Sequence, residues 1–329
     1  MSGGVLIVGD VVDGGLHPTV RQLVNAARRV ADGVKVTLCL AVDGSFDEES
    51  VDGIGIGKVV LLEHPDAGSD AVSGVYSLLT EMVCEEVDRF GPSVVLFGKT
   101  DAGAVVSARI AARFGAGLAS DCIDLAVNAD GRVAVTRPVH GGSALAVYEF
   151  AGVGLQVVSI RPGAFEGVES VGGMPEVERV DVSGVSVEGA VPVLVETVVE
   201  EGEGVPLEQA DVVVSGGRGI GGAEPFDQLR ELCGLLGAAL GASRAACDAG
   251  WIDHSHQVGL TGKSISPTTY ITVGISGASQ HMAGCSSARN IVAIDKDRDA
   301  NIFSHARYGV VGDWAKVLPA FTAAVAELD

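Results

Sequence analysis

Residues 272–284 (TVGISGASQHMAG) place polar side chains directly after a stretch typical of a buried strand. Ser276 and Gly277 lie where that strand is expected to end, and Gln280 and His281 fall in the first turn of a following helix. A turn from a strand into a helix offers backbone N–H groups and the positive end of the helix dipole, which suit a phosphate. The segment therefore predicts a binding site, with Gly274 at the strand end included. The alternative is that Ser276 is a helix cap and His281 a partly exposed surface histidine.

A second turn of the same kind is expected at residues 217–222 (GRGIGG), which satisfy the spacing G-x-G-x-x-G. The motif follows an expected strand and precedes an expected helix, where glycines let the backbone approach a diphosphate. It also places Arg218 at the end of the strand. Two such turns in one sheet favour nucleotide binding over ordinary connections.

The NAD-binding form of this motif expects an acidic residue at the end of the next strand, where it binds the ribose. Here the corresponding stretch reads GASRAACDAG (241–250), with Ser243 and Arg244 at the turn and Asp248 several residues too late. An arginine suits a phosphate or an electron-rich ring better than a ribose diol. The sequence therefore disfavours NAD.

Residues 257–267 (QVGLTGKSISP) have the composition of a loop that wraps a ligand. Gln257 and Thr261 offer hydrogen-bonding groups, Gly262 permits close backbone approach, and Lys263 adds a charge. The alternative is a surface loop with a solvated lysine.

Composition limits the possible partners of the chain. The 329 residues carry a formal net charge of −21, which disfavours binding to nucleic acid and to anionic lipid surfaces. The sequence contains no visible signal peptide and no apolar stretch of about 18 residues that could span a membrane. Six scattered cysteines form no C-x-x-C motif, so we expect buried thiols in a reducing compartment rather than disulfides or metal sites. These features together predict a cytoplasmic protein without direct membrane insertion.

The first half of the chain alternates expected strands (5–10, 35–42, 58–64 and 93–99) with expected helices (20–32, 71–90 and 104–117). This alternation is typical of a parallel, doubly wound α/β sheet. The shorter strand-like pieces at 132–140, 144–150 and 155–163 suggest an antiparallel edge or a hairpin. Residues 165–205 show no helical period.

The second half repeats the α/β alternation. Strands are expected at 211–215, 240–243, 270–276, 290–295 and 308–313, and helices at 225–240 and 314–328, the latter kinked by Pro319. The stretch EEGEGVP (200–206) is typical of a linker. The sequence thus predicts two α/β domains, 1–203 and 204–329, each a mainly parallel doubly wound sheet, the second of them Rossmann-like.

Taken together, five blocks in the second half resemble the α subunit of electron transfer flavoproteins. They are SGGRG, GASRAACDAGW, QVGLTGK, YITVGISGASQHMAG and AIDKDRDANIFSHARYGVVGDW, and their order and spacing match that family. The first half resembles the family's N-terminal domain more loosely, through VLFGKTDAGAVVSARIAARFGAGLASDC, TRPVHGG and SIRPGAF.

This resemblance implies a β subunit that contacts the N-terminal domain, and one FAD held mainly by an FAD-binding second domain. It places Arg218 and Arg244 near the flavin, Ser243 and Ser276 on the diphosphate with Gln280 nearby, Thr261 near the flavin N5 edge, His281 near the pyrimidine carbonyl, and Asp313 at the adenine. It also includes Gln257, Gly262, Gly274, Gly277 and Asp295 among the cofactor-binding residues.

Two positions depart from the family pattern. Asp295 stands where the family usually has asparagine beside the adenosine half of FAD, so it can accept but not donate a hydrogen bond there. Leu260 replaces a glutamine common before the Thr-Gly-Lys step, which removes one polar group.

The resemblance implies an electron carrier that takes electrons from acyl-CoA or other flavin dehydrogenases and passes them to a quinone-linked or other acceptor. Such a carrier needs neither a nucleophile nor a metal, and we expect His254 and His256 to be solvated. A cationic or hydrogen-bond-donating His281 would stabilise the negative charge of a reduced flavin by roughly 1.5–3 kcal/mol. Two alternatives stay open: a bifurcating flavoprotein that oxidises NADH with a second FAD in the β subunit, and an NAD-dependent dehydrogenase.

Overall fold

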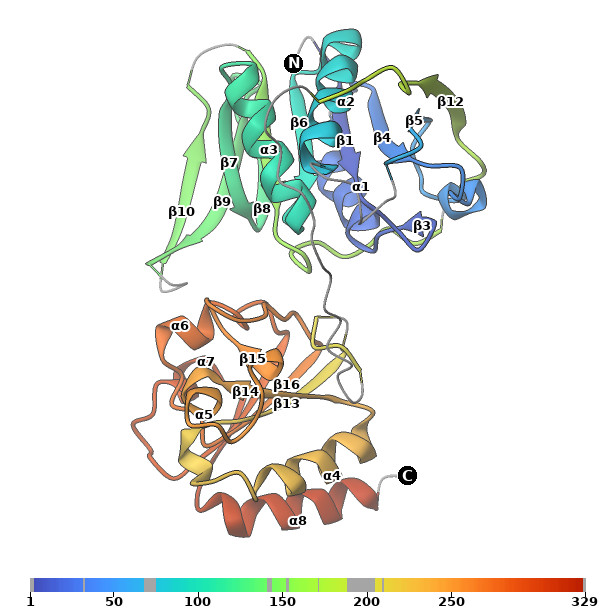
Figure 1. Cartoon of the computed structure of the whole chain (residues 1–329). Coiled ribbons are helices and arrows are strands. Elements are labelled where there is room, and N and C mark those ends of the chain that lie inside the picture. Colours follow the sequence, from blue (N-terminus) through green and yellow to red (C-terminus); the bar gives the residue numbers. More distant parts are fainter. Residues whose placement is uncertain are drawn as a thin grey trace. The chain divides into compact units, whose positions relative to one another are not determined.

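The structure is a computed structural model that describes residues 3–31, 33–67, 75–140, 144–151, 154–170, 172–187, 205–208 and 210–327. The chain divides into two compact units (Figure 1), the first mainly Met1–Pro138 and Leu145–Thr197, the second mainly Val198–Asp329. The boundary predicted between residues 203 and 204 lies outside the described residues, as does most of the linker predicted at 200–206.

The first unit is built on a seven-stranded sheet in which all neighbouring strands are parallel, in the order β12-β5-β4-β1-β6-β11-β7. The strands are β1 (Val5–Gly9), β4 (Val36–Val42), β5 (Lys58–Glu63), β6 (Val94–Gly98), β7 (Gly117–Cys122), β11 (Gln156–Ile160) and β12 (Glu176–Asp181). A small hairpin, β2 (Val11–Val12) and β3 (Gly15–Leu16), follows β1. The four strands predicted in the first half are confirmed.

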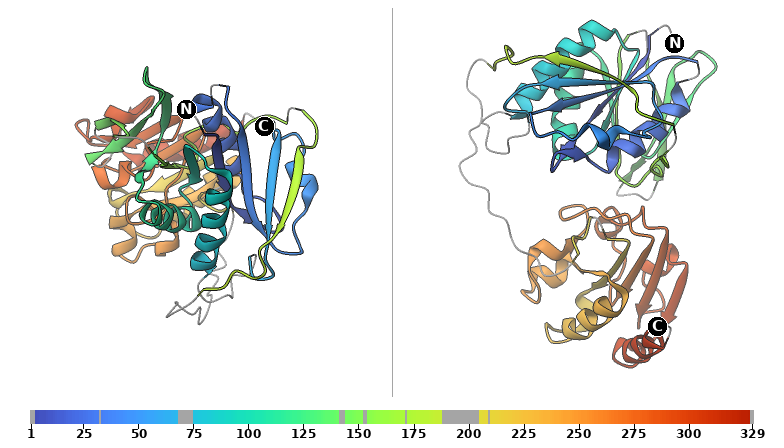
Figure 2. Two further views of the ribbon diagram at one scale, coloured as in Figure 1. Left: turned by 90° about the horizontal axis from the view of Figure 1, so that it is seen from above. Right: turned by 90° about the vertical axis from the view of Figure 1, so that its right-hand side faces the viewer.

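Helices cover both faces of this sheet (Figure 2), as the alternation predicted. α1 (Thr19–Val30) packs its apolar stripe on one face, and α2 (Val75–Phe90) and α3 (Asp101–Arg113) pack on the other. Thr100 caps α3 by accepting a hydrogen bond from the backbone N–H of Gly103. The helix ends before the predicted residue 117, because Gly115 adopts a φ of +59° and β7 begins two residues later.

The strand-like pieces after residue 118 divide between two sheets. β8 (Asp124–Val127) and β9 (Val133–Val139) are antiparallel and form a three-stranded sheet with β10 (Ala144–Glu149), which confirms the antiparallel region. The prediction is wrong for the third piece, because it forms β11 as an inner parallel strand between β6 and β7. All five residues of β11 are buried, as expected for a strand covered on both faces.

The second unit contains a six-stranded, wholly parallel sheet in the order β15-β14-β13-β16-β17-β18. The strands are β13 (Val212–Gly216), β14 (Ala239–Ser243), β15 (Gln257–Val258), β16 (Thr269–Val273), β17 (Asn290–Asp295) and β18 (Tyr308–Val311). This order, 3-2-1-4-5-6 along the chain, is that of the Rossmann fold and confirms the prediction. The winding direction reverses between β13 and β16, where ligands bind in such sheets.

Both long helices of the second unit and the short helix at 244–248 pack on one face of the sheet, and the other two short helices pack on the other face. α4 (Phe226–Leu236) and α8 (Trp314–Ala326) lie side by side on one face (Figure 1), and Pro319 lies inside α8. The short helices are α5 (Arg244–Asp248), α6 (Ser279–Met282) and α7 (Ile302–His305). α4 ends four residues before the prediction because Gly237 terminates it with a φ of +58°.

All six cysteines are buried and free, as expected from their spacing. Within the described part of the chain, no helix combines the length and apolar character needed to cross a membrane.

Candidate functional site

A cavity of about 610 Å³ lies at the carboxyl ends of β13, β14, β16 and β17. It is lined by ten of the thirteen predicted site residues: Arg218, Ser243, Arg244, Gln257, Thr261, Gly274, Ser276, Gln280, His281 and Asp295. These residues span 78 positions of the sequence, from 218 to 295, and the parallel sheet brings them to one edge. The cavity occupies the point where the winding direction of the sheet reverses.

Glycines let the ends of β13 and β16 meet directly. The N–H of Gly217 donates to the carbonyl of Val273 at 2.8 Å, and the N–H of Gly219 donates to the carbonyl of Gly274 at 2.9 Å. A Cβ atom on Gly217 would lie 2.1 Å from the carbonyl oxygen of Gly274, which itself has a φ of +65°. The glycine motif therefore brings two backbones together at the wall of the cavity.

Two other predicted glycines, Gly262 and Gly277, do not line the cavity. A Cβ atom on Gly277 would lie 2.3 Å from the backbone nitrogen of Ile302, and one on Gly262 would lie 2.3 Å from the carbonyl oxygen of Gln257. Both glycines thus have a packing role within the protein, and their contact with a ligand stays a prediction.

Two guanidinium groups give the cavity its positive charge. Arg218 lies in a single 3₁₀ turn (Arg218–Ile220) after β13 and forms no ion pair within the described residues. Arg244 begins α5, and its Nε lies 3.2 Å from Oδ2 of Asp248. Lys263, by contrast, forms an ion pair with Glu208 at 3.3 Å and does not line the cavity. Both side chains of this pair are partly exposed, so the alternative of a solvated surface lysine stays in place.

Gln257 and Thr261 belong to one hydrogen-bonded group. Nε2 of Gln257 donates to Oγ1 of Thr261 at 3.0 Å, and its Oε1 lies 3.1 Å from Nδ1 of His254. His256 places its Nδ1 2.8 Å from the carbonyl oxygen of Leu240 and is half-buried, so it is not simply solvated, whereas His254 is exposed as expected. This group holds the exposed hydroxyl of Thr261 at the cavity.

His281 is buried, with only 7 % of its surface exposed, so the alternative of a partly exposed surface histidine is wrong. Its Nε2 lies 2.8 Å from the hydroxyl oxygen of Tyr270, which is fully buried on β16. Burial lowers the pKa of His281 from 6.5 to about 4, because desolvation penalises the charged imidazolium. The imidazole is therefore neutral near pH 7, and of the two expected forms the hydrogen-bond donor is favoured over the cation.

Two buried polar atoms of cavity residues lack a hydrogen-bond partner within the described structure. They are Oγ of Ser243 and Nδ1 of His281. An unpaired buried polar group costs about 1–3 kcal/mol, which a ligand with matching groups would recover. Ser276 is exposed, and because Ala278 is the N-cap residue of α6, the alternative of Ser276 as a helix cap is wrong.

Asp295 and Asp313 both follow strands but lie in different surroundings. Asp295 ends β17, lines the cavity and accepts a hydrogen bond from the N–H of Asp297 at 2.9 Å. Asp313 does not line the cavity; its carboxylate caps α8 by accepting from the N–H of Ala315 at 3.1 Å. The contact of Asp313 with an adenine stays a prediction.

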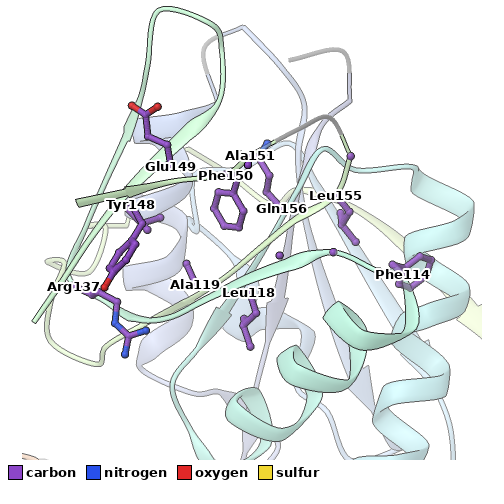
Figure 3. A pocket seen from close by; sticks show the side chains of 15 residues that line it. Phe114, Leu118, Ala119, Arg137, Tyr148, Glu149, Phe150, Ala151, Leu155 and Gln156 are labelled. Carbon is purple, nitrogen blue, oxygen red and sulfur yellow. The ribbon is translucent and has the colours of Figure 1, made fainter. Parts of the chain in front are cut away.

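The first unit has a cavity of its own, of about 600 Å³, which contains none of the predicted site residues. Apolar side chains such as Phe114, Leu118, Phe150 and Leu155 line it together with polar groups (Figure 3). Arg137 lies beside Tyr148 there, and its buried Nε has no hydrogen-bond partner in the described residues. The predicted site residues thus gather at the cavity of the second unit.

The strand order of the second unit and a cavity at its switch point define a nucleotide-binding α/β domain. Comparison with known families identifies the protein family. Residues 206–286 match the electron transfer flavoprotein FAD-binding domain, and residues 5–185 match the electron transfer flavoprotein domain. The chain belongs to the electron transfer flavoprotein family, as its α subunit, and its second unit is the family's FAD-binding domain.

Relatives align along nearly the whole chain. The electron transfer flavoprotein subunit alpha of Thermoanaerobacterium thermosaccharolyticum is 37% identical and covers 91% of this chain and 90% of its own. That of Bacillus subtilis is 37% identical, with 97% and 96% covered. Protein FixB of Clostridium saccharobutylicum is 35% identical, with 99% and 97% covered.

A glycosyltransferase structure, SnogD from Streptomyces nogalater, aligns over 99% of this chain and 95% of its own. Its TM-score of 0.26 and 11% identity are too low to bear on fold or function.

Proposed function

We propose that this chain pairs with an electron transfer flavoprotein β subunit and carries electrons through one bound FAD. Acyl-CoA or other flavin dehydrogenases would be the donors, and a quinone-linked or other protein the acceptor. The observation that carries this proposal is the cavity at the switch point of the second sheet, with two guanidinium groups and two unpaired buried polar atoms.

These groups fit the chemistry of FAD. Ser243 and Ser276 offer two hydroxyls to a diphosphate, with the amide of Gln280 beside them, and Arg218 offers a positive charge near the flavin. His281, Arg244 and Thr261 offer donors to a flavin ring. Bound FAD supplies the redox chemistry, and the chain's residues hold it and set its electrostatic surroundings.

Leu260, where the family commonly has glutamine, makes part of the cavity wall apolar. Leu260 lines the cavity with 65 % of its surface exposed, so a cofactor would meet an apolar side chain there. Asp295, at the end of β17, also lines the cavity and would bring a carboxylate to the adenosine side, where it would accept from a ribose hydroxyl.

We further propose the division into domains 1–203 and 204–329, with the first contacting the β subunit. The family models support it, because one ends at residue 185 and the next begins at 206. Strand β10 exposes Leu145, Val147 and Tyr148 by 63 %, 68 % and 48 %. Exposed apolar side chains clustered on one strand favour a surface that another protein covers.

The test is to purify the chain with its β subunit and to count the nucleotides released on denaturation. One FAD and one AMP per heterodimer are expected for the simple carrier, and a flavin dehydrogenase with its substrate should reduce the flavin. Two FAD per heterodimer together with reduction by NADH would favour the bifurcating alternative. A colourless protein with nicotinamide-dependent turnover would contradict both and favour the dehydrogenase.

A further inference from the structure

A chain of buried polar groups lies behind His281, on the side away from its unpaired nitrogen. Tyr270 is fully buried on β16, and its hydroxyl oxygen lies 2.8 Å from Nε2 of His281. The two rings are stacked, with centroids 6.0 Å apart and planes 23° apart. Ser215, on the adjacent strand β13, is fully buried close to the phenol, and its Oγ forms no hydrogen bond of normal geometry within the described residues.

The surroundings of the imidazole determine which of its nitrogens carries the proton. Burial keeps Tyr270 protonated and His281 neutral, so the ring has one donor and one acceptor nitrogen. The backbone of Val258 acts on the imidazole as an acceptor but forms no hydrogen bond of normal geometry with Nδ1. A phenol O–H can donate to Nε2, and the neutral imidazole then carries its own proton on Nδ1.

We infer that Tyr270 is a positioning residue, which donates to Nε2 of His281 and so fixes the proton on Nδ1. The nitrogen that lacks a partner within the described structure is then a donor, held ready for an acceptor atom of a ligand in the cavity that His281 lines. Tyr270 and His281 thus form a buried hydrogen-bonded pair, in which the phenol polarises the imidazole.

This role deepens the proposed function and rests on it, because a fixed donor matters most if the ligand gains negative charge. A neutral donor on Nδ1 stabilises that charge without first taking up a proton. If Tyr270 were absent, the ring could place its proton on Nε2 and turn an acceptor toward the ligand. The lone pair of that acceptor nitrogen would then repel the negative charge on the ligand.

The test combines three variants, Tyr270→Phe, Thr272→Val and His281→Ala, with two measurements on the heterodimer. Tyr270→Phe removes the hydroxyl and keeps the ring. Thr272→Val is the matched control, because it removes a buried hydroxyl two residues along the same strand, where it bonds the carbonyl of Val292 at 3.3 Å. Imidazole ¹⁵N shifts, assigned by comparison with His281→Ala, report the position of the proton with or without FAD. Redox titration reports the flavin potential.

We expect the wild-type and Thr272→Val proteins to carry the proton on Nδ1, and Tyr270→Phe to shift it to Nε2. We also expect Tyr270→Phe to lower the equilibrium constant for flavin reduction about tenfold, which lowers the midpoint potential by about 30 mV for a two-electron couple. Thr272→Val should leave the potential unchanged. A proton on Nε2 in the wild-type protein would overturn the inference, and this result does not depend on whether Tyr270→Phe folds. So would a potential unchanged by Tyr270→Phe but lowered by His281→Ala.

If the proton lies on Nδ1 and moves in Tyr270→Phe, yet His281→Ala leaves the potential unchanged, the positioning of His281 by Tyr270 is supported. In that case the redox-tuning part of the proposed function fails instead. The two failures are therefore distinguishable.

Discussion

Of the two guanidinium groups at the cavity, Arg218 should contribute more to the binding of an anionic ligand. The chain carries a net charge of −21, and Arg244, the other guanidinium at the cavity, already has Asp248 as its partner. Arg218 forms no ion pair among the described residues, so its charge is available to the anionic cofactor. A hydrogen bond between charged groups contributes about 1.5–3 kcal/mol.

Arg218→Ala should therefore weaken FAD binding roughly 10–100-fold, since 1.4 kcal/mol corresponds to tenfold. The measurement is the ratio of flavin to protein after gel filtration, followed by titration with FAD. Arg230→Ala is the control, because Arg230 is an exposed residue of α4 that pairs with Asp227 on the same helix. Equal flavin retention by the two variants would exclude Arg218 from the site.

His281 also makes the stability of the FAD-free protein depend on pH. Its pKa is about 4 in the folded state against 6.5 ordinarily, so below pH 6.5 the unfolded chain binds a proton that the folded chain does not. Stability from this residue is thus fully present above pH 6.5 and is lost as the pH falls toward 4. The loss reaches about 2 kcal/mol at pH 5, using 1.36 kcal/mol per pKa unit.

Denaturant unfolding of the wild-type protein and of His281→Asn at pH 7.5 and pH 5 measures this term. The wild-type protein should lose more stability than the variant between the two pH values, because only the wild-type protein contains this titrating group. Parallel losses in both proteins would show that His281 is not held neutral by burial.

At the scale of elements, the site depends on the close approach of β13 and β16. Gly217→Ala places a methyl group where the carbonyl oxygen of Gly274 lies, at 2.1 Å, so the two strand ends must separate. Such overpacking costs typically 1–3 kcal/mol. We expect a lower melting temperature and loss of FAD.

Gly222→Ala is the matched control in the same motif. Its Cβ would meet only Cδ of Pro225 at 3.8 Å, an ordinary contact, and its φ is not in the left-handed region. Thermal unfolding monitored by calorimetry and flavin fluorescence compares the two. A Gly217→Ala protein as stable and as yellow as Gly222→Ala would contradict the role assigned to this close approach.

The elements that the sequence predicts correctly are those with a strong local signal. β13, β16 and β17 are apolar runs followed by glycine or polar turns, so residues 217–222 and 272–284 could be recognised as strand-end turns from local pattern alone. Four edge strands of the three larger sheets, β7, β8, β12 and β15, were not predicted. β15 has only two residues, and β12 (EVERVD) is polar and largely exposed, so neither produces an apolar run.

The site was likewise predictable where it depends on turns, and unpredictable where it depends on packing across the sheet. Ten of the thirteen predicted residues line one cavity because parallel strands end at a common edge. Tyr270 could not be found in this way. It lies eleven positions before His281 in a strand, a spacing that matches no local period, and only the fold brings its hydroxyl to the imidazole.

For the whole molecule, the proposed heterodimer requires that a surface of the first domain contact the β subunit. If β10 contacts the β subunit, Val147→Lys should weaken the heterodimer by roughly tenfold or more, as expected for a charge placed in an apolar contact. Leu235→Lys, on the exposed side of α4 in the second unit, is the control. Analytical ultracentrifugation of each variant with the β subunit gives the dissociation constants, and equal constants would move the contact elsewhere.

The most direct test of the central claim is binding of FAD to the second domain's cavity. The heterodimer is freed of flavin, titrated with FAD and followed by the quenching of flavin fluorescence and by absorbance. We predict saturable binding of one equivalent by the wild-type protein, with the flavin retained through gel filtration. A heterodimer that retained no flavin even after incubation with excess FAD would contradict the assignment of this cavity to the cofactor.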